Sequence, residues 1–77
     1  MTAEWYYLSF ADETGFLGGV YVEGESMQDA YLTATLRRLN PGGEVQIVGP
    51  LHAGHVDRHV DEGDRYRLLS REEVRAT

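Results

Sequence analysis

The sequence predicts an α+β domain in which one main helix packs on one face of a small antiparallel sheet, in the order ββαβ. Three observations support this fold class. An aromatic-rich segment and a second apolar segment flank a glycine-containing turn, a capped helix start follows at Ser26, and a β-branched segment comes after Pro41-Gly42-Gly43. The chain has 77 residues and no cysteine. It is therefore expected to form one domain over residues 1–77, without disulfides to supplement its core.

The first two segments, residues 4–10 and 16–23, have the composition of paired strands. Because side chains alternate between the faces of a strand, each segment divides into two sets. One face is predicted to carry Tyr6, Leu8, Phe10, Phe16, Val20 and Val22, and the other Trp5, Tyr7, Ser9, Leu17 and Tyr21. Gly18-Gly19 indicates a bulge or a close backbone approach, which we expect to let the helix pack tightly.

The helix is predicted over Met27–Leu39. Ser26 is suited to the N-cap position and Asp29 to the reciprocal position of a capping box. Asn40-Pro41-Gly42-Gly43 ends the helix, with Asn40 or a glycine expected in the left-handed cap. One apolar stripe consists of Met27, Ala30, Tyr31 and Ala34, and a second, rotated stripe of Leu32, Leu36 and Leu39. The apolar arc is wider than contact with one sheet face normally requires.

The remainder of the chain is less regular. Residues 44–49 form the third predicted strand, and residues 51–64 are predicted to be a loop, with a short, poorly specified helix as the alternative. Residues 65–69 are compatible with a short fourth strand at the sheet edge. Ser70-Arg71-Glu72-Glu73 is a second capping-box pattern, which predicts a terminal helical turn within residues 70–77 that frays at Thr77.

Charge is distributed unevenly along the chain. Residues 1–36 carry six acids and no base, whereas residues 37–77 carry seven acids and seven arginines, for a net charge of −6. An acidic surface repels phosphate, which argues against direct nucleic-acid binding but leaves a basic protein partner or nucleic-acid mimicry open. Neither a signal peptide nor an apolar run of about 20 residues is present, so we expect a soluble, cytoplasmic protein without a membrane partner.

Three histidines are the first candidates for metal chemistry. His52, His55 and His59 would align on a helix, near Asp57 and Asp61, and such ligands could hold zinc. Glycines and a proline nearby oppose helix formation, and the segment lacks an evident apolar side. A solvated acidic loop is therefore preferred over a metal site, and no cofactor is predicted.

The sequence contains many carboxylates but no pattern that indicates a catalytic site. Glu23 and Glu25 flank Gly24, and Glu72 and Glu73 are adjacent. Catalytic carboxylates need burial or charged neighbours to shift their pKa values, and a domain this small provides little of either. The serines lack a nucleophile-elbow pattern. We therefore predict a non-enzymatic protein.

Excess apolar surface is the more informative feature. If one sheet face packs on the helix, the other exposes an aromatic set, and large exposed aromatic patches usually mark protein contacts. The alternative is that Tyr66, Leu68 and Leu69 fold across this face and cover it. Together with the second leucine stripe, the candidate interface residues are Trp5, Tyr7, Leu17, Tyr21, Leu32 and Leu36.

Several segments together resemble a group of small, uncharacterised proteins of actinobacteriophages and their actinobacterial hosts. These segments are residues 5–10 (WYYLSF), 15–18 (GFLG), 40–45 (NPGGEV) and 67–73 (RLLSREE). The resemblance covers nearly the whole chain except residues 51–64. It implies a phage or prophage origin, with the host cytoplasm as the location, and no known activity.

A weaker likeness is to the N-terminal part of HicB-type antitoxins. It rests on the acidic-glycine turn Glu23-Gly24-Glu25 before a serine cap, followed by an acidic-alanine step at Asp29-Ala30. We expect no DNA-binding domain within these 77 residues and therefore no antitoxin role.

These observations lead to three functional hypotheses. The first is a phage or prophage accessory protein that self-associates and binds a host or phage protein. The second is an acidic inhibitor that occupies a basic, nucleic-acid-binding surface of a host or defence protein. The third is zinc or small-ligand binding at the histidines.

Overall fold

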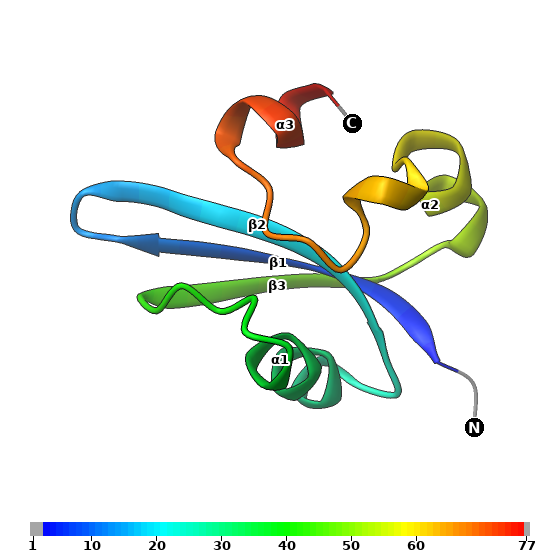
Figure 1. Ribbon diagram of the computed structural model, residues 1–77. Helices are drawn as coiled ribbons and strands as arrows, with labels where there is room; N and C mark the ends of the chain where they lie inside the picture. Colours follow the sequence, from blue (N-terminus) through cyan, green and yellow to red (C-terminus); the bar gives the residue numbers. More distant parts are fainter. Residues whose placement is uncertain (1–2, 77) are drawn as a thin grey trace.

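The computed structural model describes residues 3–76, except for the side chain of Ala76, and shows a three-stranded antiparallel sheet with helices on both faces (Figure 1). The α+β fold class is as predicted. The strands are β1 (Glu4–Asp12), β2 (Gly15–Gly24) and β3 (Glu44–Leu51). The helices are α1 (Met27–Leu36), α2 (Ala53–His59) and α3 (Arg71–Ala76), with a 3₁₀ turn, η1, over Glu62–Asp64.

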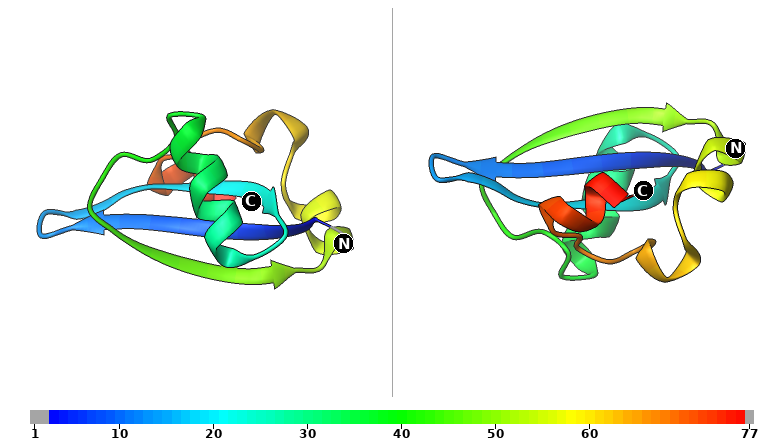
Figure 2. Two further views of the ribbon diagram at one scale, coloured as in Figure 1. Left: turned by 90° about the horizontal axis from the view of Figure 1, so that it is seen from below. Right: turned by 90° about the horizontal axis from the view of Figure 1, so that it is seen from above.

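The central strand is β1, flanked by β2 on one side and β3 on the other. Both neighbours are antiparallel to β1, so β2 and β3 run in the same direction. Strands that run in the same direction cannot be joined by a tight turn, and α1 makes the connection by crossing one face of the sheet (Figure 2). The strand order therefore requires a long crossover connection between β2 and β3, and the sequence of this connection forms a helix.

A β-bulge reverses the side-chain alternation at the start of β2. Phe10 pairs with Gly18 whereas Ala11 pairs with Phe16, which leaves Leu17 as the extra residue. Leu17 consequently packs against the core on the α1 side, and the Phe16 ring lies 5.9 Å from the Arg71 guanidinium of α3. The predicted faces of Leu17 and Phe16 were wrong because the bulge shifts the period by one residue.

The glycine pair in β2 lies at close approaches, as predicted, but its neighbours are not the helix. A Cβ at Gly19 would lie 2.3 Å from the Tyr7 hydroxyl oxygen, and a Cβ at Gly18 would lie 2.7 Å from the Leu68 Cδ1. The pair therefore makes room for the Tyr7 ring and the C-terminal segment.

The main core lies between the sheet and α1. Its buried members are Tyr6, Leu8, Phe10, Val20 and Val22 from the sheet, with Ala30 and Ala34 from the helix. The five sheet residues belong to the set predicted to share one face.

The opposite face is covered by the C-terminal third of the chain. Trp5 is buried there against Val56 and Val60. The loop prediction for residues 51–64 was wrong over Ala53–His59, which form α2, and the helical alternative was correct. Val56 and Val60 supply the apolar anchor that was not evident in the sequence, because the helix is too short to show a periodic pattern.

The segment that follows α2 lies along the free edge of β2. Gly19 and Leu69 exchange two backbone hydrogen bonds, with N···O distances of 3.0 and 2.7 Å, and the Tyr66 N–H donates to the Tyr21 carbonyl. The predicted fourth strand is reduced to isolated bridges at Gly19 and Tyr21. These bridges satisfy part of an edge that would otherwise be open to pairing with another chain.

The two remaining predicted segments differ slightly from expectation. The third strand extends through Pro50 to Leu51, which an edge strand tolerates because the proline nitrogen has no inner partner to lose. The second capping box is confirmed: the Ser70 N–H donates to the Glu73 carboxylate at 3.1 Å, and the Glu73 N–H donates to the Ser70 hydroxyl. The predicted fraying at Thr77 lies outside the described residues.

Candidate functional site

The candidate site is the side of α1 that faces away from the sheet, and its position is set by the two ends of this helix. At the N-terminus the Ser26 hydroxyl accepts from the Asp29 N–H at 3.1 Å, and the Asp29 carboxylate accepts from the Glu25 N–H at 2.8 Å. This is the predicted capping box. It fixes the exit of the chain from β2 and engages the one charged side chain between Met27 and Leu36.

The C-terminus of α1 comes earlier than predicted. The helix ends at Leu36, not Leu39, because Arg38 adopts a left-handed conformation with φ of 62°. The Arg38 N–H donates to the Thr35 carbonyl and the Leu39 N–H to the Ala34 carbonyl, at 3.1 and 2.8 Å. These two bonds form a Schellman cap in which arginine occupies the position usually held by glycine. The predicted left-handed cap at Asn40 or a glycine was wrong.

α1 approaches the sheet closely because only small side chains lie between them. Ala30 and Ala34 are fully buried, and a Cβ at Gly24 would lie 2.6 Å from the Ala30 backbone nitrogen. Of the four residues in the predicted sheet-facing stripe, Met27 and Tyr31 remain exposed instead. The contact is therefore tight but narrow, and most of the helix circumference faces away from the core.

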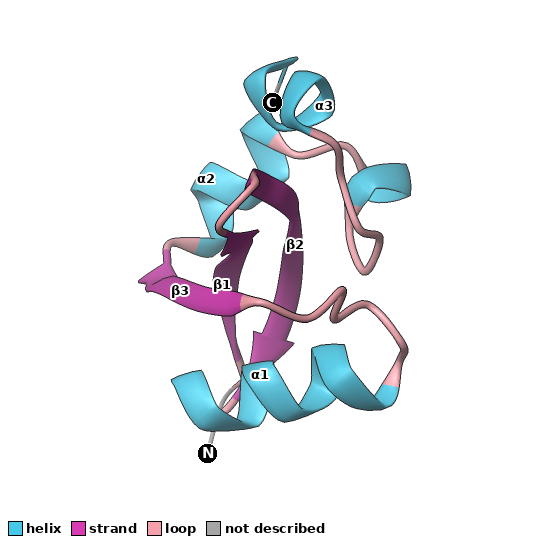
Figure 3. Cartoon of the chain, turned by 90° about the vertical axis from the view of Figure 1, so that its left-hand side faces the viewer, coloured by secondary structure: helices cyan, strands magenta, loops and turns pink. Residues whose placement is uncertain are grey.

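The outward side of α1 is apolar. We define the outer face as Met27, Gln28, Tyr31, Leu32, Thr35 and Leu36. Leu32 is 53% exposed and Leu36 is 75% exposed, and both belong to the candidate interface predicted from the sequence. Exposed helix surface normally carries charged residues, yet this face has none. Figure 3 shows α1 on one side of the sheet, with α2 and α3 on the other.

The hydroxyl groups of Tyr31 and Thr35 on this face are already bonded within the chain. The Asn40 side-chain amide donates to the Tyr31 hydroxyl and to the Thr35 hydroxyl, each at 3.1 Å. The Thr35 hydroxyl donates in turn to the Tyr31 carbonyl at 3.0 Å. Asn40 was considered only as a helix cap in the sequence, and its role in fixing this face has no local sequence signal. Apart from the Gln28 amide, the surface that this face presents to a partner is therefore mainly apolar.

The other half of the predicted interface is largely covered. The Trp5 ring lies 5.7 Å from the Tyr66 ring and 5.4 Å from the Arg65 guanidinium, beneath α2. Tyr7 and Tyr21 are half-buried, with ring centroids 4.8 Å apart, and burial raises the pKa of the Tyr7 hydroxyl. The premise that Trp5 is exposed was wrong. Of the predicted alternative cover, Tyr66 does pack on this face, but Leu68 packs on the core at the α1 side, and Val56 and Val60 cover Trp5 instead.

Tyr66 attaches this covering segment to the end of β2 and to the C-terminal end of α1. Its hydroxyl donates to the Glu23 carboxylate at 3.1 Å, and the Arg37 guanidinium lies 4.4 Å above its ring. Burial raises the pKa of Tyr66. Tyr66 also has a φ of 54°, a conformation that bulky residues rarely adopt. Because Arg37 is held in this contact, Arg38 is the more available base at the C-terminal end of α1.

The histidines do not converge on one site. His52 is the N-cap of α2, where its Nδ1 accepts from the Gly54 N–H at 3.0 Å. His55 and His59 are paired on the exposed surface of α2, with ring centroids 4.6 Å apart. Among residues 3–76, no group of three or more histidine, cysteine and acidic side chains is arranged to hold a metal ion.

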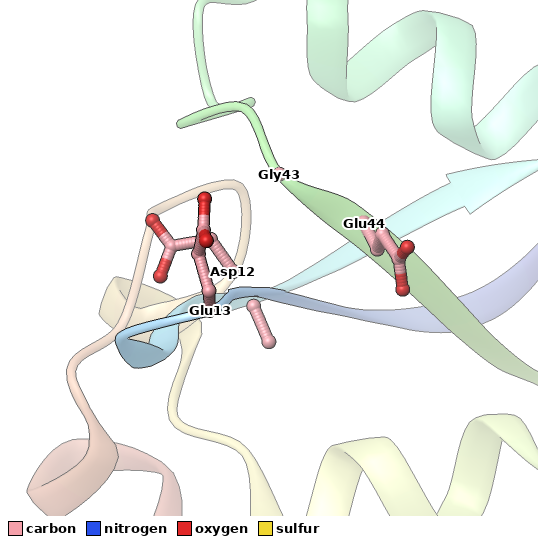
Figure 4. A pocket seen from close by; sticks show the side chains of 5 residues that line it. Asp12, Glu13, Gly43 and Glu44 are labelled. Carbon is pink, nitrogen blue, oxygen red and sulfur yellow. The ribbon is translucent and has the colours of Figure 1, made fainter.

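Acidic side chains border a groove at the end of the sheet where the β1–β2 turn lies. Asp12 and Glu13 lie at the β1–β2 turn and Glu44 at the start of β3 (Figure 4). Hydrogen bonds from Thr14 lower the pKa of Asp12. The groove is exposed, and it adds to the acidic surface noted from the sequence.

Comparison of the chain with protein-family models, curated proteins and solved structures gives no significant match. Within the part of the chain that the structure describes, no helix is both long and apolar enough to cross a membrane. The surfaces described above are therefore the basis on which a function can be proposed.

Proposed function

We propose that this chain is a non-enzymatic interaction domain that self-associates and binds a protein partner through the outer face of α1. In keeping with the sequence resemblance, it would be an accessory protein of an actinobacteriophage or prophage, and its partner a host or phage protein. The function would lie in the contact and not in chemistry at a pocket.

The observation that carries this proposal is the exposure of Leu32 and Leu36 on a helix that buries only Ala30 and Ala34. Burial of a leucine side chain contributes roughly 1.5–3 kcal/mol. Part of this contribution is missing at both leucines, and the charged residues nearest to them, Asp29, Arg37 and Arg38, lie towards the two ends of α1. Contiguous apolar surface of this kind is typical of protein contact sites.

A double substitution of the two leucines tests the proposal. Leu32→Arg with Leu36→Arg should abolish self-association measured by sedimentation equilibrium, because two charges would have to be buried. Arginine favours helices and suits the C-terminal half of α1, so the fold should be retained, which circular dichroism can check. The matched control is Val48→Arg on β3, another exposed apolar residue, 49% exposed, which should associate like the wild type. Unchanged association of the double variant would contradict the proposal.

The acidic-inhibitor hypothesis uses a different surface, namely the acids around Asp12, Glu13 and Glu44. Binding of these acids to a basic protein should weaken steeply with salt concentration, since exposed charges are screened. Contact through the outer face of α1, which is apolar at its centre, should weaken much less with salt. A salt series on any complex of this protein therefore distinguishes the two surfaces.

A further inference from the structure

The two ends of α1 carry opposite charges. Glu25 is exposed immediately before the helix, and residues 1–36 contain no base. Arg38 is exposed immediately after the helix and has no ion pair among the described residues. The apolar outer face lies between them, with Leu32 near its middle. The surface is thus apolar at its centre, with a negative charge at the N-terminal end of α1 and a positive charge at the C-terminal end.

From this charge pattern we propose that the partner on the outer face of α1 is a second copy of the chain, with the two α1 helices antiparallel about a two-fold axis. This inference rests on the proposed function and specifies its arrangement. A two-fold axis through the middle of α1 sets the same surface of both copies against each other, which is the commonest form of homodimer.

One antiparallel register satisfies the apolar and the charged residues together. Leu32 lies at the axis against Leu32 of the second copy. Leu36 then packs on Met27 and the aliphatic part of Gln28 of the second copy. In the same register Glu25 lies beside Arg38 of the second copy, and the symmetry repeats each contact.

The parallel arrangement is disfavoured by the same residues. It would bring Glu25 and Asp29 of the two copies together at one end and their arginines together at the other. It would also align the two helix dipoles, whereas the antiparallel arrangement opposes them. Like charges held close across a contact disfavour a pairing mode and thereby give specificity.

The size of the helix limits the strength of this dimer. α1 has ten residues and is therefore about 15 Å long. Such a contact falls at or below the small end of specific interfaces, so we expect a dissociation constant on the order of 100 µM.

Glu23 and Arg37 are unsuitable for testing this arrangement, because both already contact Tyr66 within the chain.

A charge exchange tests the arrangement by sedimentation equilibrium at low salt. Glu25→Arg alone and Arg38→Glu alone should each weaken homodimerisation by at least about tenfold, because two attractive pairs become repulsive. An equimolar mixture of the two variants should recover dimers, since each end of one variant then meets an opposite charge on the other. Arg58→Glu, on exposed α2, is the matched control and should leave the dissociation constant unchanged.

The outcomes separate this inference from the proposed function. Recovery in the mixture supports the antiparallel dimer. Self-association that survives both single substitutions but is lost in the Leu32→Arg, Leu36→Arg variant overturns the antiparallel pairing and leaves the outer face as the contact. A wild-type protein that stays monomeric at millimolar concentration overturns self-association itself.

Discussion

Arg38 shows how a single residue limits the stability of α1. Its left-handed conformation, with φ of 62°, costs a residue with a Cβ roughly 1–2 kcal/mol, whereas glycine would lose about 0.5–1 kcal/mol in chain entropy. We therefore expect Arg38→Gly to raise the free energy of unfolding by about 0.5–1 kcal/mol in urea denaturation at dilute protein concentration.

The control for Arg38→Gly is a glycine with positive φ at which an added Cβ would meet no other atom. Gly42 has a φ of 94°, and no atom lies within 4 Å of the position that a Cβ would take there. Gly42→Ala should therefore be destabilising through backbone strain alone. A stability loss in Arg38→Gly, or a gain in Gly42→Ala, would show that backbone strain at the positive-φ positions does not determine the stability of these variants.

Gly24 is the residue on which the close packing of α1 depends. A Cβ there would lie 2.6 Å from the Ala30 nitrogen and 2.9 Å from the Ala30 Cα, and these backbone atoms cannot move independently of the helix. We expect Gly24→Ala to destabilise the protein by about 1–3 kcal/mol in urea denaturation. Gly63→Ala, with nothing within 4 Å, should change stability by less than about 0.5 kcal/mol. Equal effects of the two would contradict this packing.

At the level of elements, α2 is held by apolar contacts with the sheet. Val56 is fully buried against Trp5, the one tryptophan in the chain. Val56→Ala should destabilise the protein by about 1–3 kcal/mol and shift the native Trp5 fluorescence to longer wavelength, as water gains access to the ring. Val48→Ala, at a half-exposed position of β3, should have a much smaller effect on both quantities. Unaltered Trp5 emission in Val56→Ala would mean that α2 does not cover this face.

The stability that the Ser70–Glu73 capping box contributes at the start of α3 is expected to depend on pH. A hydrogen bond from the Ser70 N–H, followed by the contact with Arg67, lowers the pKa of Glu73 from its usual 4.5. A carboxylate with a lowered folded pKa stabilises the protein above its unfolded pKa, and this contribution is lost as the pH falls through the folded pKa. The difference in stability between the wild type and Glu73→Gln should therefore shrink below about pH 4.5. A difference that is constant across acidic pH would refute this linkage.

The elements that could be predicted are those whose signals are local. The capping boxes at Ser26 and Ser70, the strands of the first hairpin and the face shared by Tyr6, Leu8 and Phe10 follow from spacing alone. α2 was predicted only as the alternative to a loop, because seven residues are too few for a periodic pattern that would show Val56 and the C-cap Val60 as anchors. The Leu17 face was missed because Gly18-Gly19 indicates a bulge in β2 but does not show that Leu17 is the extra residue, and the alternation was continued without it.

For the whole molecule, the decisive question was which of two apolar surfaces stays exposed. The sequence indicated both, and the outcome depended on where residues 53–69 fold, which is a long-range property. They cover Trp5 and leave Leu32 and Leu36 open. Of the six candidate interface residues, Leu32 and Leu36 are the two that are exposed, and both lie on the outer face of α1.

The most direct test of where this protein associates is a dilution series of the isotopically labelled chain, followed by amide chemical shifts. We predict concentration-dependent shifts confined to Met27–Leu36 and the flanking residues Glu25 and Arg38, with α2 and α3 unchanged, because the contact lies on one side of the sheet. Shifts centred on α2 or around Trp5, or none up to millimolar concentration, would contradict the claim that the outer face of α1 is the contact surface.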